Sequence, residues 1–89
     1  MPTVVFAPAI QRHVPSPPHR VQANTVRAAL EAAFATVPKL RDYVLEDQGQ
    51  LRKHIAIFVD GVQVRDRESL TDSVGDAAEI YVVQALSGG

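Results

Sequence analysis

Cysteine is absent from the 89-residue sequence. No disulfide, thiolate metal site or nucleophilic thiol is therefore available, which fits a reducing compartment without proving one. An excess of charge of one sign is also lacking, because nine Lys and Arg residues stand against ten Asp and Glu residues and the formal net charge is −1. A nucleic-acid-binding domain normally carries a basic patch. We therefore expect no nucleic-acid partner.

Long apolar runs are missing as well, since no segment approaches the roughly 20 apolar residues of a membrane-spanning helix. The first ten residues, MPTVVFAPAI, have no basic leader, and prolines interrupt their short apolar run. We expect neither a signal peptide nor a membrane partner, and we predict a cytoplasmic protein. The length suits one domain.

Runs rich in β-branched and aromatic residues predict strands over 3–7 and 79–86, with a short further strand over 19–23. Residues 8–20 contain four prolines, and we expect a loop there. Asp60 and Gly61 form a favoured two-residue turn, which predicts a hairpin within residues 54–66. This turn pairs Val59 with Val62 and Phe58 with Gln63 across the hairpin.

Six apolar residues between Asn24 and Pro38 have the spacing of one helix face: Val26, Ala29, Leu30, Ala33, Phe34 and Val37. We expect an amphipathic helix that Asn24 caps and Pro38 ends. Residues 39–53 look irregular and polar. From the polar loop that follows the hairpin, Leu70 and Val74 are expected to reach the core.

Together these elements predict an α+β roll in which one main helix covers one face of a mixed sheet. Alternation along the strands places the aliphatic residues on the covered face: Ile55, Ile57, Val59, Val62, Val64, Ile80 and Val82. The opposite face carries Phe58, Tyr81 and Val83, and we expect Phe6 to join them. These residues are either single exposed apolar side chains, which are common, or a surface for a partner.

Other polar groups are weaker candidates for a site. His13, His19 and His54 lack metal-ligand spacing, so we expect no metal site and assign these histidines to solvated loops or strand ends. The stretch VRDRESLTD is either a docking surface or a solvated loop with incidental ion pairs. Glu46 and Asp47 are adjacent but have no predicted apolar pocket that would raise the pKa of either carboxyl group, so they are poor catalytic acids.

The sequence ends in Leu86, Ser87, Gly88 and Gly89, directly after the last predicted strand. We expect a domain over 1–86 and a flexible tail over 87–89, whose glycines can enter a narrow channel. The α-carboxylate of Gly89 is ionised at neutral pH and resists nucleophilic attack. Its use requires activation as an acyl phosphate or acyl adenylate, and the sequence has no Gly-rich phosphate loop to do this. If the carboxylate reacts, another protein must activate it, and this chain is a carrier and not an enzyme.

The order and spacing of these parts resemble the ubiquitin-like sulfur carriers of the MoaD/ThiS type. The resemblance rests on the strand TVVFA, the helix TVRAALEAAF, the hairpin LRKHIAIFVDGVQVRD, the last strand EIYVVQAL and the terminal SGG. It implies a β-grasp fold with no bound cofactor. An E1-like enzyme would use ATP and Mg²⁺ to adenylate Gly89, and a sulfur donor of the cysteine desulfurase or rhodanese type would supply sulfur for a thiocarboxylate. An acceptor enzyme of molybdopterin, cysteine or thiamine biosynthesis would take the sulfur, and the chain could be the small subunit of such a synthase.

The resemblance also implies that Phe6 and Val83 contact the activating enzyme, and Phe58, Tyr81 and Leu86 complete the expected partner surface. Three departures concern the pathway: Gln63 stands where some relatives have an apolar contact residue, QAL stands where proline is frequent, and the insert DYVLEDQGQLRKH favours molybdopterin-type or cysteine-type carriers. Two other functions remain open. The chain is either a modifier that Gly89 joins to other proteins, or a binding module with an inert tail.

Overall fold

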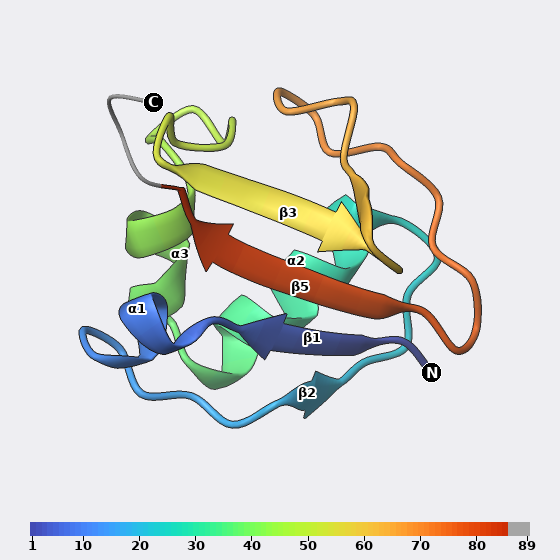
Figure 1. Ribbon diagram of the computed structural model, residues 1–89, viewed down its shortest axis with the longest axis horizontal. Helices are drawn as coiled ribbons and strands as arrows, with labels where there is room; N and C mark the ends of the chain where they lie inside the picture. The colour runs from blue at the N-terminus through green and yellow to red at the C-terminus, as the bar shows by residue number, and fades with distance from the viewer. Residues whose placement is uncertain (86–89) are drawn as a thin grey trace.

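Five strands form one mixed sheet in the computed structural model, which describes residues 1–85 (Figure 1). The strands are β1 (Thr3–Phe6), β2 (His19–Arg20), β3 (Ile55–Val59), β4 (Val62–Gln63) and β5 (Glu79–Gln84). They lie in the order β2-β1-β5-β3-β4, with β1 and β5 parallel and the other pairs antiparallel. This arrangement confirms the predicted α+β class and the mixed sheet.

The main helix, α2 (Val26–Thr36), lies against one face of this sheet, behind the strands in Figure 1. Five of its apolar residues are buried as the spacing predicts, namely Val26, Ala29, Leu30, Ala33 and Phe34. The predicted cap was wrong by one residue, because Thr25 has the extended backbone of an N-cap and its Oγ1 accepts a hydrogen bond of 3.2 Å from the Ala28 amide. Asn24 lies one residue before this cap, and its carbonyl accepts a hydrogen bond from the Val74 amide.

Two short helices were not predicted. The expected loop over 8–20 begins with α1 (Pro8–Gln11), where Pro8 occupies the first turn. A first-turn amide has no partner within the helix, so proline costs nothing there. The expected irregular segment begins with α3 (Lys39–Val44), and its Leu40 and Val44 are completely buried. Their i, i+4 spacing was the available signal, but two positions are too few to identify a helix among polar neighbours.

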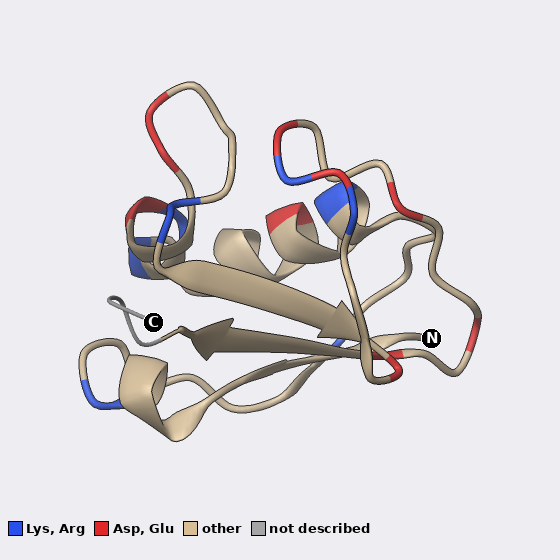
Figure 2. Cartoon of the chain, turned by 45° about the horizontal axis from the view of Figure 1, so that its top comes forward, with Lys and Arg blue, Asp and Glu red and all other residues tan. Residues whose placement is uncertain are grey.

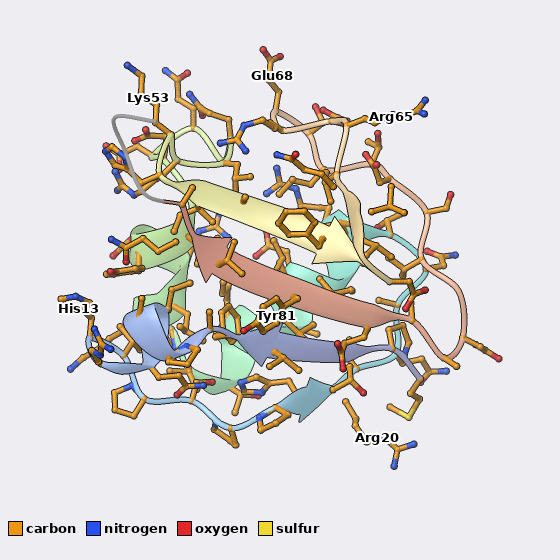
Figure 3. All side chains as sticks on the ribbon, in the orientation of Figure 1. His13, Arg20, Lys53, Arg65, Glu68 and Tyr81 are labelled. Carbon is orange, nitrogen blue, oxygen red and sulfur yellow. The ribbon has the colours of Figure 1, made fainter. Side chains whose placement is uncertain are left out.

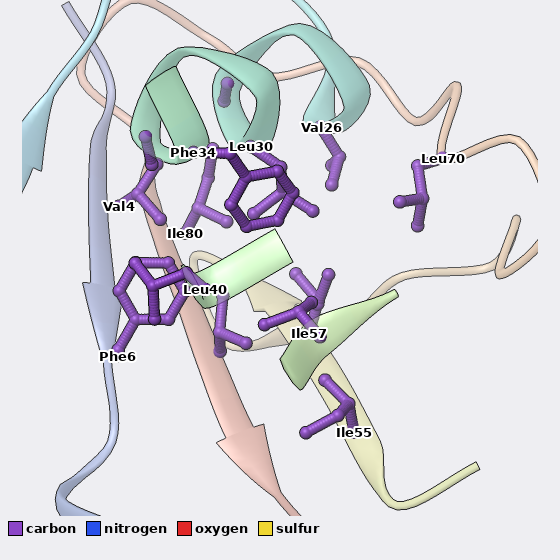
Figure 4. Packing of buried hydrophobic residues seen from close by; sticks show 14 of the residues in the cluster. Val4, Phe6, Val26, Leu30, Phe34, Leu40, Ile55, Ile57, Leu70 and Ile80 are labelled. Carbon is purple, nitrogen blue, oxygen red and sulfur yellow. The ribbon is translucent and has the colours of Figure 1, made fainter. Parts of the chain in front are cut away.

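The core fills the space between α2 and the sheet. Figure 4 shows Leu30 and Phe34 of α2 pointing into this space, together with Ile57 and Ile80 of the strands. Leu70 and Val74 are also buried, which confirms that both reach the core from their loop. None of the helices within residues 1–85 is long and apolar enough to span a membrane.

The predicted hairpin is confirmed in its turn and its register. Asp60 and Gly61 have φ angles of 50° and 84°, and Val59 pairs with Val62. The burial of Val62 was predicted wrongly, because its side chain is 67% exposed. β4 is only two residues long and forms the edge of the sheet, so the core does not extend beneath it.

Charged residues lie mainly in the loops and helices, and the strands are nearly free of them (Figure 2). Arg27 of α2 connects two of these loops by donating hydrogen bonds to the carbonyls of Gly49 at 2.7 Å and Ser69 at 3.2 Å. The loops therefore have fixed positions relative to the helix, although they are polar.

Candidate functional site

The register of the three central strands determines which segments meet at the end of β5. Phe6 at the end of β1 lies beside Val82, and Ile55 at the start of β3 lies opposite Gln84. The Ala85 amide then donates a hydrogen bond of 2.6 Å to the carbonyl of His54. The chain therefore leaves the sheet between the segment that follows β1 and the segment that precedes β3. Leu86, Ser87, Gly88 and Gly89 lie outside the described residues, so their predicted roles stay predictions.

Three of the predicted partner residues share the sheet face opposite α2. Phe58 pairs with Tyr81, and Val83 pairs with Ala56 on the same face. Tyr81 is 36% exposed, while Phe58 and Val83 are partly exposed. Figure 3 shows Tyr81 in front of the sheet, on the side away from α2.

Phe6 was assigned to the wrong face. Its register partner is Val82, which points into the core, and the ring of Phe6 is only 2% exposed. This ring and the ring of His19 form a T-shaped pair at a centroid distance of 6.1 Å. Phe6 is therefore a core residue and does not contribute to the outer surface.

Val5 is the outer-face residue of β1 that the sequence analysis missed. It lies beside Tyr81 in the parallel pair and is partly exposed. Alternation within the run TVVFA requires Val4 and Phe6 to share one face and Val5 to lie on the other, but only the pairing with β5 decides which face α2 covers. We call Val5, Phe58, Tyr81 and Val83 the outer-face patch.

A second group of side chains surrounds the exit of β5. The ring of His13, which follows α1, stacks on Tyr43 of α3 at a centroid distance of 5.3 Å. The Tyr43 hydroxyl donates a hydrogen bond of 2.7 Å to Oε1 of Gln84. Beside them is an open hollow of about 320 Å³, lined by Asp42, Tyr43, Arg52, His54, Ile55 and Gln84. Sequence analysis had no signal for this group, since its members come from four separate segments.

The histidines differ from one another in their surroundings. His13 and His54 are exposed, as predicted for loop and strand-end positions. His19 is not solvated as expected, because it is 9% exposed and its Nε2 lies 2.5 Å from Oγ of Ser16. Burial lowers the pKa of His19 below its usual value of 6.5. No group of three or more His, Asp or Glu side chains within residues 1–85 has the arrangement of a metal site.

Two carboxylates of the charged stretch VRDRESLTD accept hydrogen bonds from other residues of the same stretch. Asp66 accepts hydrogen bonds from the amides of Glu68, Ser69 and Thr71 and from the Thr71 hydroxyl. The Thr71 hydroxyl and these amides hold the pKa of Asp66 at about 2. Asp72 accepts from the amides of Arg65 and Asp66, and these bonds also lower its pKa. The loop is thus ordered by its own aspartates, which favours a structural role.

Glu46 and Asp47 do not form a catalytic pair. Glu46 accepts a hydrogen bond of 3.0 Å from Arg52, and both side chains are partly exposed. Asp47 is exposed on the same loop. Neither carboxyl group is enclosed in an apolar environment.

The roll of a five-stranded mixed sheet around α2 defines a ubiquitin-like β-grasp protein. A family model described as the ThiS family matches residues 16–89, and the chain belongs to this family. This assignment confirms the β-grasp fold and the MoaD/ThiS resemblance, and it supports the class of ubiquitin-like sulfur carriers, which act with partner enzymes.

Solved structures agree on the fold. A chain of the Amycolatopsis orientalis BexX/CysO complex has a TM-score of 0.82 at 18% identity, with 100% of both chains covered. CysO of Mycobacterium tuberculosis has a TM-score of 0.81 at 17% identity, over 97% of this chain and 100% of that one. SAMP1 of Haloferax volcanii has a TM-score of 0.78 at 23% identity, over 99% and 98% of the two chains. A search of curated proteins found no match.

Proposed function

We propose that the chain is a sulfur carrier whose reactive group is the carboxylate of Gly89. The observation that carries this proposal is the family match, which continues through residue 89 and so includes Gly88 and Gly89. The strand register supports it, because β5 ends at Gln84 and the described chain has its last backbone hydrogen bond at Ala85, four residues before Gly89.

The chemistry has three steps, and all of them take place on partner proteins. First, an oxygen of the Gly89 carboxylate attacks the α-phosphorus of ATP on an E1-like enzyme that holds Mg²⁺, and pyrophosphate leaves. Second, a persulfide sulfur attacks the acyl carbon and AMP leaves with the electron pair of the broken C–O bond. A second thiol then reduces the resulting acyl disulfide and releases the thiocarboxylate. Cysteine desulfurases and rhodanese-type enzymes provide persulfides of this kind.

In this proposal the chain supplies recognition and the acyl group but no catalytic side chain. The outer-face patch contacts the activating enzyme and later the acceptor enzyme, with Tyr81 as its most exposed member. The acceptor is a cytoplasmic biosynthetic enzyme of the cysteine, molybdopterin or thiamine type.

The test is reconstitution with candidate E1-like enzymes, ATP, Mg²⁺ and a persulfide donor, followed by intact-mass measurement. The proposal predicts that one oxygen of the chain is replaced by sulfur, and that a chain lacking Gly89 stays unmodified. Because deletion of Gly89 removes a residue beyond the sheet, its thermal unfolding should match that of the full chain. Modification of the shortened chain would contradict the assignment of Gly89.

A protein-modifier function is the second candidate. SAMP1 is the small archaeal modifier protein 1, so a modifier is among the chains of this fold. The same acyl adenylate would then be attacked by a lysine amine of a target, with loss of AMP and formation of an isopeptide bond. Higher-mass forms of this chain in a denatured cell lysate would support the modifier function. A lysate that contains the thiocarboxylate form but no higher-mass forms would exclude it.

A further inference from the structure

We infer that the side chains around the exit of β5 form a docking collar for the acidic rim of the activating enzyme's active site. The collar consists of Arg12, His13, Tyr43, Lys53, His54 and Gln84. The inference rests on the proposed function, because it names the surface through which Gly89 is presented, and it is separate from the outer-face patch.

The reach of the tail is the first argument. The last backbone hydrogen bond of the described chain joins Ala85 to His54, and four residues follow it. Four extended residues span at most about 14 Å. An acyl adenylate must be kept from water, so the enzyme has to enclose the Gly89 carboxylate. The mouth of this enclosure therefore comes within about 14 Å of Ala85, which brings it against the surface around the exit.

The sheet topology determines which side chains surround the end of β5, where the activating enzyme would approach. Since β1 is parallel to β5, the segment after β1 carries Arg12 and His13 to the same end of the sheet. Since β3 is antiparallel to β5, the segment before β3 carries Lys53 and His54 there. Figure 3 shows His13 and Lys53 at this end, whereas Arg20 lies toward the other end.

The collar has a rigid base. Tyr43 joins it to α3, because its ring stacks on His13 and its hydroxyl donates to Gln84. The hollow of about 320 Å³ beside Tyr43 gives room for a partner side chain next to the exit. A base already ordered in the free chain reduces the entropy lost when a partner binds.

The charges of the collar decide the chemistry of the partner. Arg12 and Lys53 are exposed and form no salt bridge with any residue of 1–85. Arg52 differs, because Glu46 and the carbonyl of Asp42 already accept its hydrogen bonds. The collar contains no acidic residue, and the hollow beside it adds one, Asp42, so the surface around the exit carries a small positive excess. Acidic side chains on the rim of the enzyme complement Arg12 and Lys53, and such rim charges act mainly on the rate of association and its salt dependence.

The experiment uses the full chain and an E1-like enzyme that converts it to the thiocarboxylate. The double variant Arg12→Glu, Lys53→Glu is compared with a matched control, Arg20→Glu, Arg65→Glu, in which two exposed arginines outside the collar are reversed. Circular dichroism verifies that both fold. We expect the collar variant to raise KM about tenfold at low salt with little change in kcat, and the control to change KM less than about twofold. High salt should reduce the difference between the collar variant and the wild type.

Three outcomes overturn the inference. Equal KM values for the collar variant and the wild type show that the collar is not contacted, although the carrier function stands. Equal loss in the collar and control variants shows that only net charge matters. If no E1-like enzyme of the source organism modifies the wild-type chain, the proposed function fails, and the inference fails with it.

Discussion

Replacing Phe6 and Tyr81 by alanine, one at a time, tests the register of β1 and β5. Phe6 is 2% exposed and points into the core, whereas Tyr81 is 36% exposed on the opposite face. Removing a buried phenylalanine side chain costs about 3–5 kcal/mol, because a cavity remains where the ring was. This is a large part of the roughly 5–15 kcal/mol that stabilises an ordinary domain.

The Tyr81 substitution should cost less. Complete burial of an aromatic side chain contributes about 1.5–3 kcal/mol, so a ring that is about two-thirds covered contributes roughly 1–2 kcal/mol. Its removal leaves no enclosed cavity, since solvent already reaches that face. For a domain of this size each kcal/mol shifts Tm by roughly 4–8 °C. We therefore expect Phe6→Ala to lower Tm by at least about 12 °C and Tyr81→Ala by clearly less.

Urea denaturation gives the free energies of unfolding, and KM with the activating enzyme shows whether the substituted side chain contacts that enzyme. Phe6→Leu serves as the folded variant, because it keeps an apolar side chain in the core. We expect Tyr81→Ala to raise KM and Phe6→Leu to leave it unchanged. The reasoning is refuted if Tyr81→Ala destabilises the chain as much as Phe6→Ala does, or if Phe6→Leu raises KM as Tyr81→Ala does.

Three further predictions concern stability. Because Thr25 caps α2, Thr25→Ala should lower the free energy of unfolding, measured in urea, by about 1 kcal/mol, and Asn24→Ala should lower it much less. A larger loss in Asn24→Ala than in Thr25→Ala would identify Asn24 as the cap instead. The pKa of Asp66 falls from 3.8 to about 2 on folding, so its stabilisation is complete above pH 3.8 and is lost as the pH falls toward 2. The Asp66→Asn variant should not show this loss of stability between pH 3.8 and about pH 2. Acid-unfolding curves that superimpose for the variant and the wild type would refute the stabilising role of Asp66. Burial lowers the pKa of His19 from 6.5, so the free energy of unfolding of the wild type should fall as the pH drops below 6.5. The free energy of unfolding of His19→Gln should fall less over the same pH range. Equal dependence on pH in the two proteins would contradict the burial of a neutral imidazole.

The sequence was sufficient for elements whose pattern is long or whose turn is specific. The α2 stripe repeats over eleven residues, so one helix face could be recognised without tertiary information. The Asp60-Gly61 turn determined the register of the hairpin, because a two-residue turn leaves one way to pair the strands.

Other features depended on contacts between distant segments. Whether Phe6 faces α2 depends on its parallel pairing with β5, since the run TVVFA alone contains apolar residues on both faces. The collar requires the ends of three strands and one helix to meet, and no local pattern shows that His13 and Tyr43 stack. α1 and α3 are too short for periodicity, and packing against the rest of the chain stabilises them.

The most direct test of the sulfur-carrier assignment is tandem mass spectrometry of the chain purified from its source cells. We expect a fraction of the molecules to carry sulfur in place of one oxygen, and we expect fragmentation to assign this sulfur to Gly89. Cells without the E1-like enzyme should contain only the carboxylate form. Sulfur at another residue, or a carboxylate form alone in cells that contain the enzyme and the sulfur donor, would contradict the account.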